Sequence, residues 1–300
     1  MIEQPLSSLE AWVAYFSQAT IPVLRHTAQE LELLRGNAEK VNARVLAGVI
    51  LHDPLMTLRV LAYIEERRRE RQTTDITTIE RALMMIGMNP FFRDFQEMPL
   101  IEDLLKEHPR ALLGLLKTIN RARRSANWAR DWAIFRHDLD VDEITVATLL
   151  YDIAEILMWV FAPSLAHKVQ ELQRADKQRR SASVQLEIYG VPLFELKSAL
   201  IKAWHLPELL STLVESRNDT NPRVRNVKLA VDLARHSANG WDDAALPDDY
   251  KGIRDLLHIS QPTLIRRLGL DDQKTAAMLL DAAQEFDATE LSRDSTKPSE

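Results

Sequence analysis

The sequence predicts an all-α protein, an irregular multi-helix bundle, and two observations lead to this fold class. The residues that favour helices (Leu, Ala, Glu, Arg and Lys) dominate the composition, whereas the 300 residues include only 8 glycines. β-Sandwiches and barrels need many tight turns, which such scarce glycine does not favour. Apolar residues also recur at helical spacing along most of the chain, and no segment alternates convincingly as a strand would.

Start and stop signals divide the chain into helices. Asp53 can cap free N–H groups ahead of Pro54, which loses no hydrogen bond at a first helical position. Thr77 or Thr78 can cap the next helix, and Gly87 is expected to end it. The expected helices cover residues 9–18, 23–34, 39–51, 54–69, 79–85, 109–123 with a continuation toward 135, 141–161, 163–176, 183–189, 192–204, 207–215, 224–236, 250–257, 261–268 and 271–286.

The most apolar of these helices, 141–161, follows a capping-box pattern formed by Asp140 and Glu143. Its apolar stretch contains Asp152 and Glu155, which the hydrocarbon of a bilayer would penalise. We therefore expect a buried core helix and not a membrane span.

The composition also indicates in which compartment the protein works and which partners its charge does not favour. The chain has no cysteine, which excludes disulfides and thiolate metal sites and fits a cytoplasmic protein. The N-terminal residues show neither the basic region nor the apolar run of a signal peptide. The formal net charge is −6, so bulk electrostatics does not favour nucleic acid.

Three stretches stand in order along the chain. They read VILHDPLMT at 49–57, ITTIERALMMIG at 76–87, and ATLLYDIAE at 147–155, the last followed by Gly190 and by AWHLP at 203–207. Together they resemble the motifs of the HDOD family, a relative of the HD-type metal phosphohydrolases. The resemblance extends over roughly residues 20–235 and implies an HD-like helical core. It also implies protein–protein signalling in bacteria, alongside two-component or cyclic-dinucleotide systems.

The resemblance suggests an organisation in lobes. We expect an N-terminal helical lobe at 1–127, an HD-like helical lobe at 128–257, and C-terminal helices packed on it at 258–286. The composition of residues 287–300, rich in Ser, Thr, Asp, Lys and Pro, predicts a disordered tail.

The departures from the HD pattern bear on activity. HD hydrolases hold metal through a His, an adjacent His-Asp pair and a further Asp, and Tyr151-Asp152 stands where that pair would fall. A phenol, with a pKa of about 10, is a poor ligand for a divalent metal at neutral pH. Another histidine of the family pattern is replaced by Leu193. We therefore expect a non-catalytic module with no metal and no cofactor.

Polar residues recur along the helix expected at 141–161. Thr145, Thr148, Asp152 and Glu155 follow at steps of three, four and three, so they would share one stripe. This stripe either faces water or lines the remnant of the old active-site cleft. If the carboxylates are buried, arginine or lysine from neighbouring helices must pair with them. The candidate cleft and ligand-binding residues are Thr148, Tyr151, Asp152, Glu155 and Trp204.

Other polar clusters have simpler interpretations. His52-Asp53 is better explained as a helix cap than as a metal dyad. The acidic residues after His137 lack the Gly and Glu that a calcium loop needs, and favour an acidic helix start. The basic runs at 65–71 and 121–124 are interpreted as solvated helix faces.

Three functions remain open. The first is a regulatory module that binds signalling proteins or a ligand. The second is a metal-dependent phosphohydrolase of the cyclic-nucleotide phosphodiesterase type with relocated ligands. The third is a nucleic-acid-binding regulator that uses the two basic runs.

Overall fold

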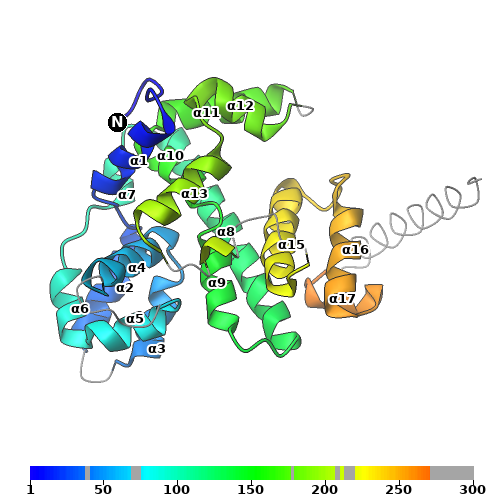
Figure 1. The fold of residues 1–300 in the computed structure, drawn as a ribbon, viewed down its shortest axis with the longest axis horizontal. Coiled ribbons are helices and arrows are strands. Elements are labelled where there is room, and N and C mark those ends of the chain that lie inside the picture. The colour runs from blue at the N-terminus through cyan, green and yellow to red at the C-terminus, as the bar shows by residue number, and fades with distance from the viewer. Residues whose placement is uncertain (38–40, 69–75, 177–178, 207–209, 213–219, 271–300) are drawn as a thin grey trace, which may run out of the picture.

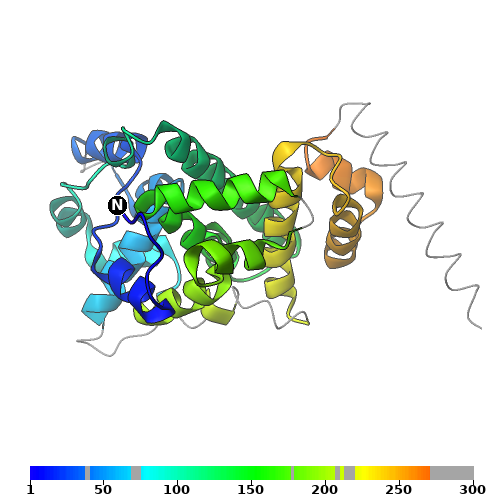
Figure 2. The same ribbon diagram turned by 90° about the horizontal axis from the view of Figure 1, so that it is seen from above.

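The computed structural model describes residues 1–37, 41–68, 76–176, 179–206, 210–212 and 220–270. Within these residues the secondary structure is helical, apart from one isolated parallel bridge between Val23 and Leu100. The all-α prediction is therefore confirmed. In Figures 1 and 2 the blue and cyan N-terminal helices lie at one end of the molecule and α16 and α17 at the other.

The N-terminal part of the chain folds into short helices. They are α1 (Leu9–Gln18), α2 (Arg25–Arg35), α3 (Ala43–Ile50), α4 (Pro54–Arg68), α5 (Ile79–Ile86), α6 (Met88–Asp94) and α7 (Ile101–Leu104). The last two were not predicted: they have only seven and four residues, and no side-chain cap marks the start of either. Helix α1 packs against α13, far away in sequence, while α2 to α6 pack mainly among themselves.

The remaining helices are arranged around one long element. They are α8 (Pro109–Phe135), α9 (Val141–Leu149), α10 (Ile153–Phe161), α11 (Pro163–Ala175), α12 (Ser181–Tyr189), α13 (Leu193–Ala203), α15 (Pro222–His236), the 3₁₀ turn η2 (Ser237–Asn239), α16 (Leu246–Leu257) and α17 (Gln261–Arg267). Helix α8 packs against α9, α10, α11 and α15 (Figure 1). It is continuous over 27 residues, so the boundary expected at residue 127 falls inside it.

The predicted single helix 141–161 is wrong, because the chain turns between α9 and α10. The amides of Tyr151 and Ile153 donate to the carbonyls of Thr148 and Leu150, three residues back. The α-helical hydrogen-bond pattern is therefore replaced by a tighter turn here and resumes in α10. Asp140 makes no side-chain cap. Apolar residues continue through the turn, and for this reason hydropathy alone did not reveal it.

The segment Val141–Phe161 is long and apolar enough to cross a membrane by length and composition. Its most apolar window is 83% buried inside the protein, as expected for the core of a soluble protein. The interpretation as buried core therefore agrees with the structure, although the segment forms two helices.

Several predicted helix ends are confirmed by their geometry. Asp53 accepts hydrogen bonds from the amides of Leu55 and Met56 at 2.9 and 3.2 Å, and Thr78 accepts one from Arg81. Gly190 ends α12 in the left-handed region, with φ of 74°. The helix expected at 250–257 begins four residues earlier than predicted, because α16 starts at Leu246.

One continuous hydrophobic core extends from Trp12 to Leu270 and includes residues of both expected lobes. The helices expected at 207–215 and 271–286 and the tail at 287–300 lie wholly or mostly outside the described residues.

Candidate functional site

The turn between α9 and α10 brings most of the predicted site residues together. Thr148 is near the end of α9, Tyr151 and Asp152 form the turn, and Glu155 is in the first turn of α10. The tight backbone at residues 150–152 directs the carboxylates of Asp152 and Glu155 toward α8. Helix α8 supplies the positively charged side chain that pairs with these two carboxylates.

Arg121 of α8 bridges the two carboxylates. Its Nε and Nη2 atoms donate to Oδ2 of Asp152 at 3.1 and 2.9 Å, and Nη2 also donates to Oε2 of Glu155 at 2.6 Å. The other oxygen of Glu155 lies 3.1 Å from the hydroxyl of Thr118. The side chains of Arg121 and Asp152 are only 18% and 10% exposed, so these contacts are shielded from water.

A second cation reaches the other oxygen of Asp152. Nη2 of Arg235, on α15, lies 3.6 Å from Oδ1 of Asp152. Arg235 also pairs with Asp232, one turn earlier on the same helix. Each carboxylate oxygen of Asp152 therefore faces a different guanidinium group.

Lys197 of α13 completes the group of charges, which we call the arginine–carboxylate cluster (Arg121, Asp152, Glu155, Lys197 and Arg235). The ammonium of Lys197 lies 3.5 Å from the centre of the Tyr151 ring, a cation–π contact in a buried place. The cluster joins residues of α8, α10, α13 and α15 through the α9–α10 turn.

The environment shifts the ionisation of these groups. Burial by itself would raise the pKa of Asp152, but Arg121 and Arg235 oppose it and hold the pKa below its usual value. Burial lowers the pKa of Lys197 to about 8, only partly offset by the nearby Asp152. Burial also raises the pKa of Tyr151. At neutral pH the phenol therefore stays protonated while Asp152 is ionised.

The polar stripe of Thr145, Thr148, Asp152 and Glu155 was predicted either to face water or to line a cleft, and the first of these alternatives is wrong. Thr145 and Thr148 are buried, and their hydroxyls donate to the carbonyls of Val141 and Ile144, one turn earlier. Trp204 is the C-cap of α13 and packs partly buried against the core. Among the described contacts, no hydrogen bond, ion pair or ring contact joins Trp204 to the arginine–carboxylate cluster.

The donor set at Asp152 does not fit a divalent metal ion. The acids near it are Glu155 and Asp232, and an arginine pairs with Asp152 and each of them: Arg121 with Glu155, and Arg235 with Asp232. A metal ion there would meet cations where it needs neutral or anionic ligands. Across the part of the chain that the structure describes, no group of three or more His, Asp or Glu side chains could hold a metal.

The other acidic and His-Asp candidates are structural. Asp53 caps α4 and also accepts the amide of Leu24 at 2.8 Å. Asp138 pairs with Arg136 at 3.2 Å and lies 4.0 Å from Arg223, which also pairs with Asp140. These contacts agree with the interpretations as a helix cap and as an acidic helix start.

The basic run 121–124 is not a positively charged surface. Arg121 points into the arginine–carboxylate cluster, while Arg124 donates to Ser237 and stacks on Trp128. Residues 69–71 of the other run, 65–71, lie outside the described residues. Sequence reasoning placed Arg121 on a solvated face. The only signal for its true role was the general need of buried carboxylates for basic partners.

These observations define a helical protein whose central acidic side chains are held by arginines. A family model for the HDOD domain matches residues 21–220. The match covers more than half of the sequence, and the chain belongs to the HDOD family.

Solved structures with TM-scores above 0.5 share this fold at low sequence identity. The MmoQ response regulator from Methylococcus capsulatus str. Bath has a TM-score of 0.60 at 19% identity, covering 87% of this chain and 98% of its own. A virulence factor from Campylobacter jejuni subsp. jejuni has a TM-score of 0.61 at 16% identity, covering 92% and 98%. An HDOD domain protein of unknown function from Geobacter sulfurreducens has a TM-score of 0.46 at 18% identity, covering 91% and 97%. The comparison with curated proteins gives no match.

Proposed function

We propose that the chain is a non-catalytic regulatory module of bacterial signal transduction, which acts in the cytoplasm by binding a protein partner or a ligand. Its partners would be signalling proteins of a two-component or cyclic-dinucleotide pathway. One structurally similar protein is described as a response regulator. At 19% identity that likeness concerns the fold, so the proposal depends on the site itself.

The observation that carries the proposal is the pairing of Asp152. Catalysis by an HD-type site would need this carboxylate to be free to bind metal, but Arg121 and Arg235 occupy both of its oxygens. Removing Arg121 would leave the shielded carboxylate of Asp152 with only the more distant Arg235 as counter-charge, which is energetically costly. The cluster therefore supports a structural role, in which it fixes α8, α10, α13 and α15 relative to one another.

A hydrolysis assay tests the proposal. Wild-type protein and Asp152→Ala are incubated with bis-p-nitrophenyl phosphate and with cyclic dinucleotides, in the presence of Mg²⁺, Mn²⁺ or Fe²⁺. We expect both proteins to show the background rate of buffer and metal alone. Turnover by the wild type that disappears in Asp152→Ala would contradict the proposal and favour the phosphohydrolase.

A further inference from the structure

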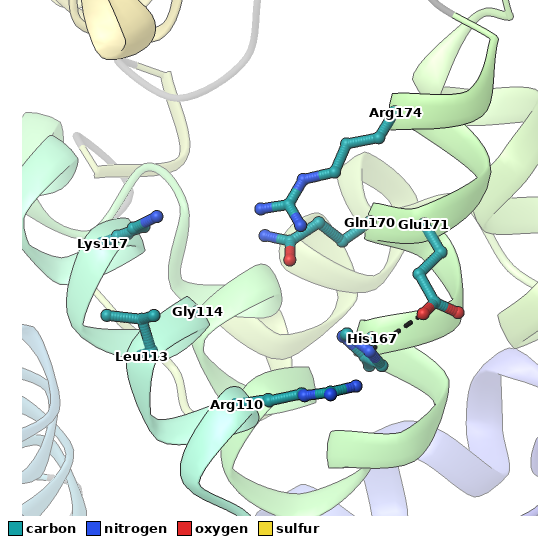
Figure 3. A pocket seen from close by; sticks show the side chains of 8 residues that line it. All are labelled: Arg110, Leu113, Gly114, Lys117, His167, Gln170, Glu171 and Arg174. Carbon is teal, nitrogen blue, oxygen red and sulfur yellow. Dashed lines mark ion pairs between the residues drawn. The ribbon is translucent and has the colours of Figure 1, made fainter.

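A second polar region lies on the outside of the bundle, between α8 and α11. It is a groove of about 250 Å³ lined by Arg110, Leu113, Gly114, Lys117, His167, Gln170, Glu171 and Arg174. In each helix the lining residues follow at steps of three, one and three, so one face of α8 meets one face of α11. Figure 3 shows Gln170 and Arg174 pointing from α11 toward α8, and Arg110 pointing toward His167.

The floor of this α8–α11 groove depends on Gly114. The ring of Trp159, from α10, packs so closely beneath it that an added Cβ at position 114 would lie 2.6 Å from the ring. The absence of a side chain here makes room for the Trp159 ring and lets α10 pack closely against α8. The floor is therefore built by close packing of α8, α10 and α11 and does not depend on loops.

Three cations of the groove are unpaired. Within the described part of the chain, Arg110, Lys117 and Arg174 have no hydrogen-bond or ion-pair partner, and none belongs to the residues with further contacts. Their charges are concentrated in one groove of a chain whose formal net charge is −6. Such a local concentration of positive charge attracts anions even on an acidic protein.

The remaining polar groups also favour an acceptor-rich ligand. The one acid in the groove, Glu171, is engaged by Nε2 of His167 at 3.1 Å (Figure 3). The other nitrogen of that ring, Nδ1, is buried and has no partner among the described residues. Gln170 adds an amide with two N–H donors. Phosphate oxygens accept hydrogen bonds from the guanidinium, ammonium and amide groups of Arg110, Arg174, Lys117 and Gln170, and offer no competing donors when fully ionised.

We propose that the α8–α11 groove binds the phosphate groups of a small phosphorylated molecule. Arg110 and Arg174 suit planar, two-pronged contacts to phosphate oxygens, and Lys117 adds a point charge. The volume lies below the range of about 300–1,000 Å³ usual for pockets that enclose a whole drug-sized ligand. The groove therefore takes the phosphate end of the ligand and leaves the rest at the surface, where the exposed Leu113 offers apolar contact.

This inference goes beyond the proposed regulatory function and does not depend on it. The groove and the arginine–carboxylate cluster use different side chains of α8, so phosphate binding can be present whether or not Asp152 takes part in catalysis.

Titration calorimetry at low salt tests the inference, with inorganic pyrophosphate, inorganic orthophosphate, a nucleoside diphosphate and oligoglutamate as probes. The groove variant Lys117→Glu/Arg174→Glu changes one residue on α8 and one on α11. The control Arg130→Glu/Lys168→Glu makes the same change of charge on the same two helices, at exposed residues outside the groove. Circular dichroism and thermal unfolding establish that both variants are folded.

We expect wild type and control to bind pyrophosphate, and the groove variant to bind it about tenfold or more weakly. Binding of a nucleoside diphosphate by the wild type, with equal loss in the groove variant, would show that the phosphate is carried on a larger molecule. Orthophosphate binding alone, with the same loss, would indicate the free ion. The inference is overturned if no phosphate probe binds, or if groove variant and control weaken binding equally. It is also overturned if only an acidic peptide such as oligoglutamate binds.

Discussion

Arg121 and Asp152 form the central pair of the arginine–carboxylate cluster: the guanidinium group donates two hydrogen bonds, at 2.9 and 3.1 Å, to a single carboxylate oxygen. The pair joins α8, the longest helix among the described residues, to the turn between α9 and α10. Both side chains are largely shielded from water, so neither can lose its partner without a large cost in free energy.

Arg121→Met is therefore expected to lower the free energy of unfolding by about 3 kcal/mol, because Asp152 and Glu155 lose their shared partner. Urea denaturation followed by circular dichroism measures the change. Arg130→Met, at an exposed position of the same helix, serves as control and should change stability by no more than about 0.5 kcal/mol. Adding Asp152→Asn and Glu155→Gln to Arg121→Met should recover part of the loss. Equal stability of the two arginine variants would show that the bridge does not matter.

Lys197 predicts a dependence of stability on pH. Burial lowers its pKa to about 8 in the folded state, whereas the unfolded value is about 10.4. Between these values the unfolded state binds more protons, so the free energy of unfolding should rise with pH, by at most about 1.4 kcal/mol per unit. Denaturation at pH 8, 9 and 10 should show a smaller rise in Lys197→Met than in the wild type. Parallel curves would mean that Lys197 titrates normally.

The close packing at Gly114 predicts that two glycine-to-alanine substitutions in helices will change stability in opposite directions. Gly114→Ala should destabilise the protein by about 1–3 kcal/mol, because the new Cβ would lie 2.6 Å from the Trp159 ring. Gly48 of α3 has no atom within 4 Å of an added Cβ, so Gly48→Ala should stabilise the helix by up to about 1 kcal/mol. Thermal unfolding of both variants tests whether the first substitution lowers the stability and the second raises it. A neutral Gly114→Ala would contradict the packing of α10 against α8.

The neighbouring residues His52 and Asp53 should respond very differently to alanine. Asp53 accepts backbone amides from Leu24, Leu55 and Met56, so Asp53→Ala should cost about 2 kcal/mol of stability. His52 is exposed, and His52→Ala should be close to neutral. Asp53→Asn keeps one acceptor oxygen and should fall between the two. If His52→Ala were as damaging as Asp53→Ala, the dyad would have a role beyond the helix cap.

Much of the fold could be predicted because its signals are local. Caps such as Asp53 and Thr78 act on the next turn of their own helix, and Gly190 ends α12 through its own backbone angles. The turn at residues 150–152 could not be predicted in this way, because both helices beside it are buried on nearly every face and the sequence stays apolar throughout.

The candidate site could be predicted only in part. Family motifs pointed to Tyr151, Asp152 and Glu155, and the need for basic partners followed from their burial. Which partners they have depends on how α8, α13 and α15 pack, and a single helix pattern does not contain that information. Arg121 lies within a run of arginines that resembles a charged surface, and only the tertiary structure distinguishes it from its neighbours.

The metal content of the purified protein tests the central claim most directly. Native protein and Asp152→Ala are dialysed without chelator and analysed by inductively coupled plasma mass spectrometry for Fe, Mn, Mg and Zn. If Arg121 and Arg235 take the place of a metal ion, both proteins should contain only trace amounts. Near-stoichiometric metal in the native protein that is lost in Asp152→Ala would contradict the account and identify Asp152 as a ligand.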